Sequence, residues 1–198
     1  MTLTLDQENL PLLGIAAWSG TGKTTLLERL LPVLRERGMH VAVIKHAHHQ
    51  FDVDQPGKDS HRLRQAGAAP MLVASRTRFA LMMETPDQDE PDLLSLINQV
   101  RSLRPDLVLI EGFKSWPVPK LELHRVSLGK DMLAMSDTWV RAVACDAVVP
   151  VPAGVELLDL DDLDAIASWV MAWPSRWSSV RTPRAGNNEP DEPRGAGS

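Results

Sequence analysis

The chain is poor in the residues that build disulfides, zinc sites and aromatic surfaces. Its 198 residues include one cysteine, no tyrosine and three phenylalanines. With Cys145 alone, neither an intramolecular disulfide nor a four-cysteine zinc site can form, so we expect a reducing compartment. The shortage of aromatic side chains argues against a platform on which nucleic-acid bases stack. Leucine, valine, alanine, methionine and six tryptophans are left to fill the interior.

Excess positive charge and long apolar runs are missing as well. The 21 lysines and arginines face 26 aspartates and glutamates, which gives a net charge of −5. This charge balance argues against a broad nucleic-acid-binding surface, but it does not argue against a single positively charged pocket. No stretch reaches the roughly 18 to 20 consecutive apolar residues that a membrane helix needs. Residues 1–9 carry acids rather than the basic start of a signal peptide, so we expect a cytoplasmic protein that binds neither nucleic acid nor membrane.

Apolar runs alternate with segments of helical spacing, which is typical of an α/β protein. Residues 10–17 form a continuous apolar run, as in a strand that is covered on both faces. Leucines then recur at helical spacing over residues 26–34, and residues 40–45 give a second apolar run. A strand, a crossover helix and a second strand form a right-handed parallel unit. We therefore predict an α/β fold: a three-layer, P-loop NTPase-type, predominantly parallel sheet with flanking helices and an inserted β-hairpin.

The remaining segments are predicted to complete one domain over residues 1–173. The hairpin follows from the short link at residues 75–78 between two apolar runs. From residue 174 onward almost nothing is apolar, so burial cannot offset the entropy lost on ordering, and we expect residues 174–198 to be a disordered tail. The other predicted strands are 71–74, 79–83, 106–111, 120–124, 139–144 and 155–160, and the other predicted helices are 58–66, 93–100 and 162–172.

A glycine-rich turn between the first predicted strand and the first predicted helix carries the strongest functional signal. In this setting backbone N–H groups surround a β-phosphate, and the helix N-terminus adds partial positive charge. Ala17 stands where such loops usually have a first glycine, so the sequence does not decide how tight the turn into the loop is. Lys23 would reach the β- and γ-phosphates and act in catalysis, the Thr24 hydroxyl would coordinate Mg²⁺, and Thr25 would contact the α-phosphate. The predicted nucleotide-binding residues are Ser19, Gly20, Thr21, Gly22, Lys23, Thr24 and Thr25.

The end of the predicted strand 106–111 supplies a second set of candidates. Glu111 would face the phosphate loop and hold Mg²⁺ directly or through water, as in a Walker-B strand; the alternative is a cap exposed to solvent. Asp106, at the other end, is more typical of a strand boundary. Gly112 and Lys114 follow as candidate phosphate contacts, with a plain surface position as the alternative for Lys114.

The polar loop at residues 46–57 is another candidate cluster. It is predicted to lie at the C-terminal edge of the sheet, where open α/β sheets bind their ligands. Asp54 or Asp52 could coordinate Mg²⁺ or orient water in a switch-like loop, which makes Asp54 a candidate catalytic and metal residue. The alternatives are a solvated loop without chemistry and a zinc site, for which the helical i, i+4 histidine pair is missing.

Two single residues have weaker signals. Arg78, in the hairpin link, could place a positive charge on the nucleotide or could be a surface residue. Asp146, after the predicted strand 139–144, could accept hydrogen bonds from guanine N1–H and N2–H₂, although the sequence has no Asn-Lys-x-Asp motif. Tryptophans such as Trp169 and Trp173 are interpreted as packing or subunit-interface residues.

Five short motifs occur in a specific order and spacing. They are Ala-Ala-Trp-Ser-Gly-Thr-Gly-Lys-Thr-Thr-Leu at 16–26, Ile-Lys-His-Ala-His-His at 44–49, Asp-Gln-Pro-Gly-Lys-Asp-Ser at 54–60, Gln-Ala-Gly-Ala-Ala at 65–69 and Ile-Glu-Gly-Phe-Lys at 110–114. With these motifs, the chain resembles the molybdopterin-guanine dinucleotide biosynthesis protein B family over about residues 10–172.

The resemblance implies a GTP-binding adapter with weak intrinsic GTPase activity, usually a homodimer. Such an adapter associates with the molybdenum cofactor guanylyltransferase and could also meet a molybdopterin-containing intermediate. The resemblance carries over the phosphate loop at 20–25, the Mg²⁺ acid Glu111, and the loop acids Asp52, Asp54 and Asp59. The preference for GTP over ATP is implied by the resemblance alone, because the usual base-reading motif is absent.

Two other functions stay open at this point. One is a small-molecule kinase or ligase that transfers the γ-phosphate of ATP to a substrate held by residues 46–59. The other is a nucleotide-free scaffold with a vestigial phosphate loop. Hydrolysis would proceed by in-line attack of water, with charge stabilised by Lys23, Mg²⁺ and the loop amides. Neither an arginine finger nor a water-positioning glutamine is evident, so we expect a slow rate, which favours an adapter.

Overall fold

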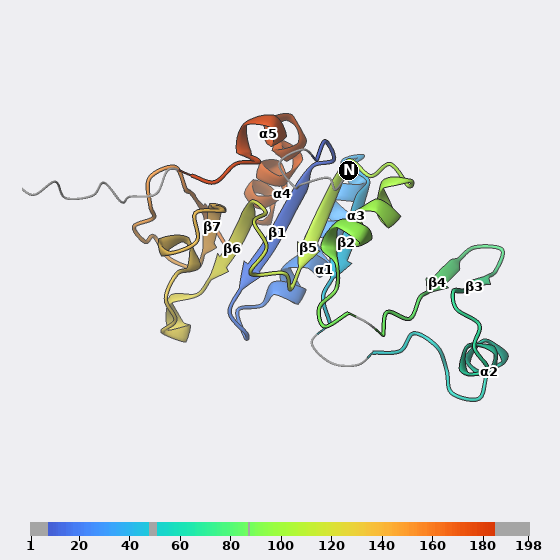
Figure 1. Cartoon of the computed structure of the whole chain (residues 1–198). Coiled ribbons are helices and arrows are strands. Elements are labelled where there is room, and N and C mark those ends of the chain that lie inside the picture. Colours follow the sequence, from blue (N-terminus) through green and yellow to red (C-terminus); the bar gives the residue numbers. More distant parts are fainter. Residues whose placement is uncertain (1–7, 48–50, 87, 185–198) are drawn as a thin grey trace, which may run out of the picture. The chain divides into compact units, whose positions relative to one another are not determined.

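The computed structural model describes residues 8–47, 51–86 and 88–184. The described residues form two compact units, one from residues 8–45 with 94–184 and one from the described part of residues 46–93 (Figure 1). The loop and hairpin after the second strand form the second unit because their contacts are made mainly among themselves. The single domain predicted over residues 1–173 stays a prediction.

A six-stranded parallel sheet in the order β2-β5-β1-β6-β7-β8 is the centre of the first unit. This confirms the predicted α/β fold with its mainly parallel sheet. Every residue of four of the strands (β1, β5, β6 and β7) is buried. Burial on both faces explains the continuous apolar runs of β1 and β5, whereas β6 buries Lys120, Glu122 and His124 among its apolar residues. The strands are β1 (Leu12–Ala17), β2 (Val41–Lys45), β5 (Leu107–Glu111), β6 (Lys120–His124), β7 (Val140–Cys145) and β8 (Glu156–Asp159).

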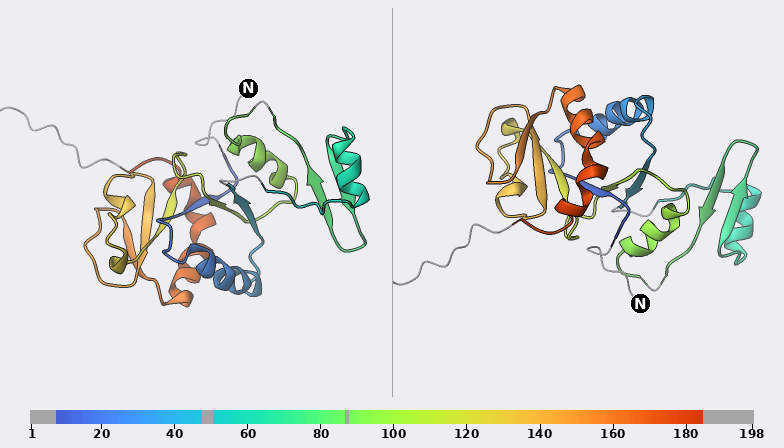
Figure 2. Two further views of the ribbon diagram at one scale, coloured as in Figure 1. Left: turned by 90° about the horizontal axis from the view of Figure 1, so that it is seen from below. Right: turned by 90° about the horizontal axis from the view of Figure 1, so that it is seen from above.

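Helices cover both faces of this sheet. Figure 2 shows α1 and α4 on one face and α3 on the opposite face, which gives the three layers. Four of the five leucines at helical spacing in α1 are buried, as the sequence predicted, and Leu31 is half-buried. The helices are α1 (Lys23–Glu36), α3 (Leu93–Arg101), α4 (Leu163–Met171) and α5 (Trp173–Val180), with short 3₁₀ turns η2 (Val126–Leu128) and η3 (Leu133–Met135).

Helix α5 corrects the prediction that a disordered tail begins at residue 174. Trp173 and Trp177 are buried, and their indole N–H groups donate to the carbonyls of Leu12 (2.9 Å) and Glu8 (2.7 Å). Two tryptophans therefore anchor a helix whose other residues are mostly polar, because each buries a large apolar area and pairs its polar atom. The part of the expected tail at residues 185–198 lies outside the described residues.

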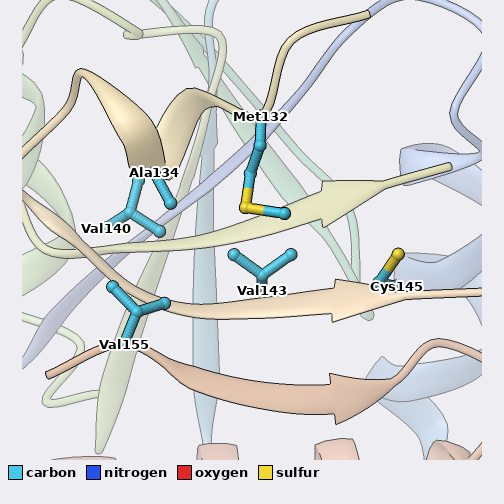
Figure 3. Close-up of a cluster of buried hydrophobic side chains, with 6 residues drawn as sticks. All are labelled: Met132, Ala134, Val140, Val143, Cys145 and Val155. Atoms are coloured by element: carbon cyan, nitrogen blue, oxygen red, sulfur yellow. The ribbon is translucent and has the colours of Figure 1, made fainter. Parts of the chain in front are cut away.

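A cluster of buried side chains packs one side of β7 against the η3 segment (Figure 3). Glu122, wholly buried on β6, holds η3 in place because its carboxylate accepts the backbone N–H groups of Leu133 (2.7 Å) and Ala134 (2.8 Å). Burial raises the pKa of Glu122 above its usual value. The cluster consists of Met132, Ala134, Val140, Val143, Cys145 and Val155.

The second unit contains the predicted hairpin. Strands β3 (Met71–Ala74) and β4 (Phe79–Met82) pair antiparallel, and α2 (Asp59–Gln65) precedes them. No residue of α2 is buried. The unit exposes the apolar side chains of Phe51, Val53, Leu63, Leu72, Val73, Phe79, Leu81 and Met83. Across the described parts of both units, none of the helices is long and apolar enough to cross a membrane.

Candidate phosphate-loop site

The turn that joins β1 to α1 has the backbone of an anion-binding loop. Gly20 and Gly22 have φ values of 84° and 96°, a region that residues with a side chain rarely adopt. No atom lies within 4 Å of a Cβ built at either glycine, so backbone conformation rather than space requires them. Gly22 is the N-cap of α1 and offers no side chain to the first N–H groups of the helix. Those donors remain for a ligand, as at other helix N-termini that bind phosphate.

The loop is also held by hydrogen bonds of its own. The Thr21 hydroxyl donates to the Trp18 carbonyl at 2.7 Å, and the Thr21 N–H donates to the same oxygen at 3.3 Å. Thr21 is buried, whereas the sequence placed its N–H among the phosphate contacts. Within the structure Thr21 therefore shapes the loop. The other predicted loop residues stay accessible: Lys23 is half-buried, and Ser19, Gly20, Gly22, Thr24 and Thr25 are exposed.

Two lysines meet one carboxylate at the C-terminal end of the sheet. The Nζ atoms of Lys23 and Lys45 both lie 3.5 Å from Oε1 of Glu111. The strand register causes this meeting, because Glu111 on β5 pairs with Lys45 on β2 and with Ile15 on β1. Glu111 is buried, which is incompatible with the alternative of a solvent-exposed cap. Asp106 caps the far end of the strand pair, where it accepts the His40 N–H at 2.7 Å.

Lys45 was not among the residues predicted from the sequence. The signal that could have found it is its position at the end of an apolar run predicted to be parallel to the 106–111 strand. Without the order of the strands, however, nothing placed it beside Glu111. The tertiary structure supplies that order.

Residues after β5 border the start of the phosphate loop. The ammonium group of Lys114 lies 5.3 Å from the centre of the Trp18 ring, a cation–π arrangement. Trp18 in turn donates its indole N–H to the Asp131 carbonyl at 2.8 Å. Gly112 has a φ of 94°, which lets the chain turn sharply at the end of β5. Lys114 is thus near the loop, and its contact with phosphate stays a prediction.

A hollow of about 260 Å³ opens beside the loop. Arg125, just after β6, lines it and donates from Nε to the Thr21 carbonyl at 3.0 Å. Its Nη1 lies 3.3 Å from Asp146 Oδ2, and the Val126 N–H donates to Asp146 Oδ1 at 3.1 Å. These donors, Val126 first and then Arg125, hold the pKa of Asp146 below its usual value. The hollow is lined by Gly20, Thr21, Gly22, Thr25, Leu26, Arg29, Arg125, Leu160 and Asp161.

A second hollow, of about 360 Å³, lies where β7 and β8 end. It shares Asp146 with the network just described, and burial raises the pKa of the Cys145 thiol at its edge. The second hollow is lined by Cys145, Asp146, Ala147, Val148, Leu157, Leu158 and Asp159.

Arg125, which lines the first hollow, was not predicted from the sequence; its position directly after the predicted strand 120–124 was the available signal.

The predicted residues Asp54 and Arg78 belong to the second unit. There Asp54 accepts the Ser60 hydroxyl at 2.7 Å and lies 3.6 Å from Nε of Arg64. Arg64 also pairs with Glu84 and Asp52, and these hydrogen bonds, the one to Glu84 first, raise its pKa. These carboxylates thus fix the fold of the unit around one guanidinium, and the catalytic and metal roles of Asp54 stay predictions.

The nucleotide role of Arg78 also stays a prediction. Its side chain is exposed, and its backbone carbonyl closes the hairpin turn by accepting the Ser75 N–H at 2.7 Å. Asp59, carried over by resemblance, is exposed in the first turn of α2. In the residues described, no three His, Cys, Asp or Glu side chains gather as a metal cluster, and the loop histidines 48 and 49 lie outside those residues.

The strand order, the glycine turn ahead of α1 and the acidic end of the neighbouring strand define a three-layer α/β fold of the P-loop NTPase type. The family model "Molybdopterin guanine dinucleotide synthesis protein B" matches residues 12–146. The chain belongs to this family.

Relatives agree with this assignment. The molybdopterin-guanine dinucleotide biosynthesis adapter protein of Escherichia coli (strain K12) is 49% identical over 165 residues, which is 83% of this chain and 93% of that protein. The protein of the same name from Haemophilus influenzae is 42% identical over 172 residues, or 87% and 94% of the two chains. The crystal structure of Bacillus subtilis MobB matches with a TM-score of 0.64 and 26% identity, covering 82% of this chain and 97% of the other.

Proposed function

We propose that this chain is an adapter in molybdopterin guanine dinucleotide biosynthesis and that it binds GTP with Mg²⁺ at the phosphate loop. The observation that carries the proposal is the loop itself: two glycines with positive φ open α1, and the Lys23 ammonium and Glu111 carboxylate meet beside it. The adapter role is supported by family membership, since the relatives from E. coli and H. influenzae carry that name over most of their length.

Phosphate binding follows from charge and backbone direction. The first N–H groups of α1 and the Lys23 ammonium supply donors to the β- and γ-phosphates, and Thr25 stands at the next turn for the α-phosphate. In the free protein Lys23 is paired with Glu111. A phosphate would compete for Lys23, and Lys45 would remain as a partner for the Glu111 carboxylate.

The residues present fit Mg²⁺. The Thr24 hydroxyl is exposed next to Lys23, and Glu111 offers a carboxylate at the same edge. Mg²⁺ usually takes one or two protein oxygens and fills its other positions with phosphate and water, so the lack of a larger acidic cluster in the described residues suits it. Thr24 and Glu111 would hold the ion, which when bound neutralises charge on the β- and γ-phosphates.

The nucleoside is assigned to the hollow beside the loop. Thr25 and Arg29 of α1 line it together with Leu160 and Asp161, which follow β8, so apolar and charged groups are both available. The preference for guanine rests on the family likeness. Weak GTPase activity is part of the proposal because Lys23 and the loop amides stabilise charge, whereas rapid hydrolysis also needs a group that orients water.

We further propose that the partners are the guanylyltransferase and a second copy of the chain. The hairpin β3–β4 is a sheet of only two strands, and a pair this small is marginally stable alone. Its open edges and exposed apolar side chains fit a second hairpin of the same kind. This surface therefore supports a homodimer.

Calorimetric titration with GTP and ATP, each with and without Mg²⁺, tests the nucleotide proposal. Tight binding of GTP that depends on Mg²⁺ is expected. Binding of ATP alone would instead favour the kinase or ligase class, and binding of neither nucleotide would favour a scaffold.

Sedimentation experiments test the adapter role. Adding the guanylyltransferase to the GTP-loaded chain should form a complex; absence of a complex would contradict the adapter role.

A further inference from the structure

The segment of residues 125–131, here named the clamp segment, forms hydrogen bonds with the phosphate loop at two points. At one end Arg125 donates from Nε to the Thr21 carbonyl at 3.0 Å. At the other end the Asp131 carbonyl accepts the Trp18 indole N–H at 2.8 Å. Within the loop, the Thr21 hydroxyl and the Trp18 carbonyl are joined at 2.7 Å. One segment after β6 thus holds both ends of residues 18–21.

Asp146, directly after β7, anchors the clamp segment. Its Oδ1 accepts the Val126 N–H at 3.1 Å and its Oδ2 pairs with Arg125 Nη1 at 3.3 Å. A guanidinium is planar with donors in a fixed fork, so bonds through Nε and Nη1 together fix its plane. The Arg125 Nε–H is therefore aimed at Thr21 because Asp146 holds the other side of the fork.

The direction of the Thr21 carbonyl has a consequence for the loop. A trans peptide bond is planar, with its carbonyl and N–H on opposite sides. A Thr21 carbonyl fixed toward Arg125 turns the Gly22 N–H away from Arg125. Gly22 is the N-cap of α1, so this N–H is one of the donors at the helix end that binds phosphate in the proposed function.

We propose that Asp146 is a positioning residue that acts through Arg125 to fix the Thr21–Gly22 peptide before nucleotide arrives. The proposal rests on the proposed nucleotide-binding function of the loop. It is an alternative to the sequence interpretation in which Asp146 reads guanine, which stays a prediction. Each oxygen of Asp146 accepts a protein donor from the clamp segment, which supports the positioning role. A loop that is ordered in advance binds more tightly, since less conformational entropy is lost on binding.

The test compares the full-length variants Asp146→Asn and Arg125→Met with the wild type. Hydrogen exchange of the peptide covering residues 18–26 is measured without nucleotide, and affinities for Mg²⁺ with GTP, and with xanthosine triphosphate, are measured by calorimetry. Both variants should exchange faster in this peptide and bind GTP about tenfold more weakly, as expected for loss of a charge-assisted hydrogen bond. The double variant should lose no more than Arg125→Met alone, because Asp146 acts through Arg125.

Xanthosine triphosphate separates positioning from base reading. Xanthine has a carbonyl where guanine has its 2-amino group, so an asparagine that replaced a guanine-reading aspartate could donate to it. Positioning predicts that Asp146→Asn weakens binding of both nucleotides by the same factor. A gain for xanthosine triphosphate, or unchanged exchange and affinity, would overturn the proposal.

Two further variants keep the result interpretable. Arg125→Lys retains the charge but not the fork, so it should give an intermediate effect and serves if Arg125→Met fails to fold. Arg176→Gln removes an exposed ion pair with Glu156 (2.8 Å) and should leave loop exchange and affinity unchanged. If the wild type bound no nucleotide while Asp146→Asn still loosened the loop, the proposed function would fail and the clamp would stand.

Discussion

Lys23 and Lys45 share one carboxylate oxygen of Glu111, and under the proposed function the two lysines have different tasks. Lys23 begins α1 and belongs to the phosphate loop, while Lys45 ends β2 and is more exposed. A bound phosphate would draw Lys23 from Glu111 without leaving that buried carboxylate unpaired. Under the proposed function, the Glu111 carboxylate would therefore keep a charged partner with and without nucleotide.

The first prediction concerns Lys23→Ala. This change should weaken binding of GTP with Mg²⁺ by about 2 kcal/mol or more, because one partner of a charge-assisted pair is lost. Calorimetry measures it. Arg35→Ala is the matched control, since it removes a cation from the last turn of the same helix, about 18 Å away along the axis. Equal affinities of Lys23→Ala and wild type would contradict a phosphate-binding loop.

Glu111→Gln provides the second prediction. The amide keeps the shape but lacks the charge, so the part of GTP affinity that depends on Mg²⁺ should fall while the melting temperature changes little. Titrations with Mg²⁺ and with excess chelator separate the two contributions. An equal loss in both conditions would show that Glu111 does not act through the metal.

Among the elements, α5 shows how few side chains can attach a polar helix to the core. Trp173 stacks against Trp169 at 4.9 Å between ring centres, and Trp177 reaches the Glu8 carbonyl. Beyond α5, Arg184 still donates to the carbonyls of Ala134 and Ala153. The C-terminal part of the described chain is therefore a structural element of the first unit.

Trp177→Ala should destabilise the protein by about 3 to 5 kcal/mol, the usual effect of removing a buried indole. Urea unfolding followed by circular dichroism measures the free energy of unfolding. Ser178→Ala, an exposed change in the same helix, should have almost no effect. If Trp177→Ala proved as mild as Ser178→Ala, α5 would not be packed as described.

The η3 turn gives a prediction for pH dependence. Burial raises the pKa of Glu122, so the folded state holds this proton more tightly than the unfolded state does. The associated stability is present below the unfolded pKa and is lost as the pH rises through the folded pKa. The wild-type free energy of unfolding should thus fall with pH relative to that of Glu122→Gln. Urea unfolding at a series of pH values measures this difference. If the free energies of unfolding of the two proteins changed with pH in parallel, the raised pKa of Glu122 would be contradicted.

For the whole molecule, the proposed function places nucleotide binding in one unit and association with another copy of the chain in the other. The first unit carries the phosphate loop, Glu111 and both hollows. The second is small, held around Arg64, and leaves apolar side chains of its hairpin exposed. An adapter needs both kinds of surface, one for its ligand and one for other chains.

Leu81→Asp tests the proposed homodimer. Leu81 pairs across the hairpin with Leu72, and both are exposed. Wild-type protein should show roughly twice the 21.9 kDa chain mass in light scattering, and Leu81→Asp should shift it toward the monomer because a charge would be buried without a partner. Thr77→Asp, in the exposed hairpin link, should stay dimeric. A monomeric wild type would contradict this use of the hairpin.

Local pattern was enough to predict most of the elements. The apolar runs gave the parallel strands and the leucine spacing gave α1, because burial on both faces or on one stripe leaves a direct trace in the sequence. The glycine turn could be located for the same reason, since Gly20 and Gly22 occupy backbone conformations that other residues avoid. Family likeness then supplied the biosynthetic setting.

What tertiary structure alone decided is which ends of strands meet. Strand order brought Lys45 to Glu111, and the path after β6 brought Arg125 to Thr21. It also brought Asp54 next to Arg64 and buried Trp177. The spacing of residues in the sequence predicted neither of these positions. The physical reason is that periodicity records whether a residue is buried, whereas pairing between distant residues depends on the packing of the whole chain.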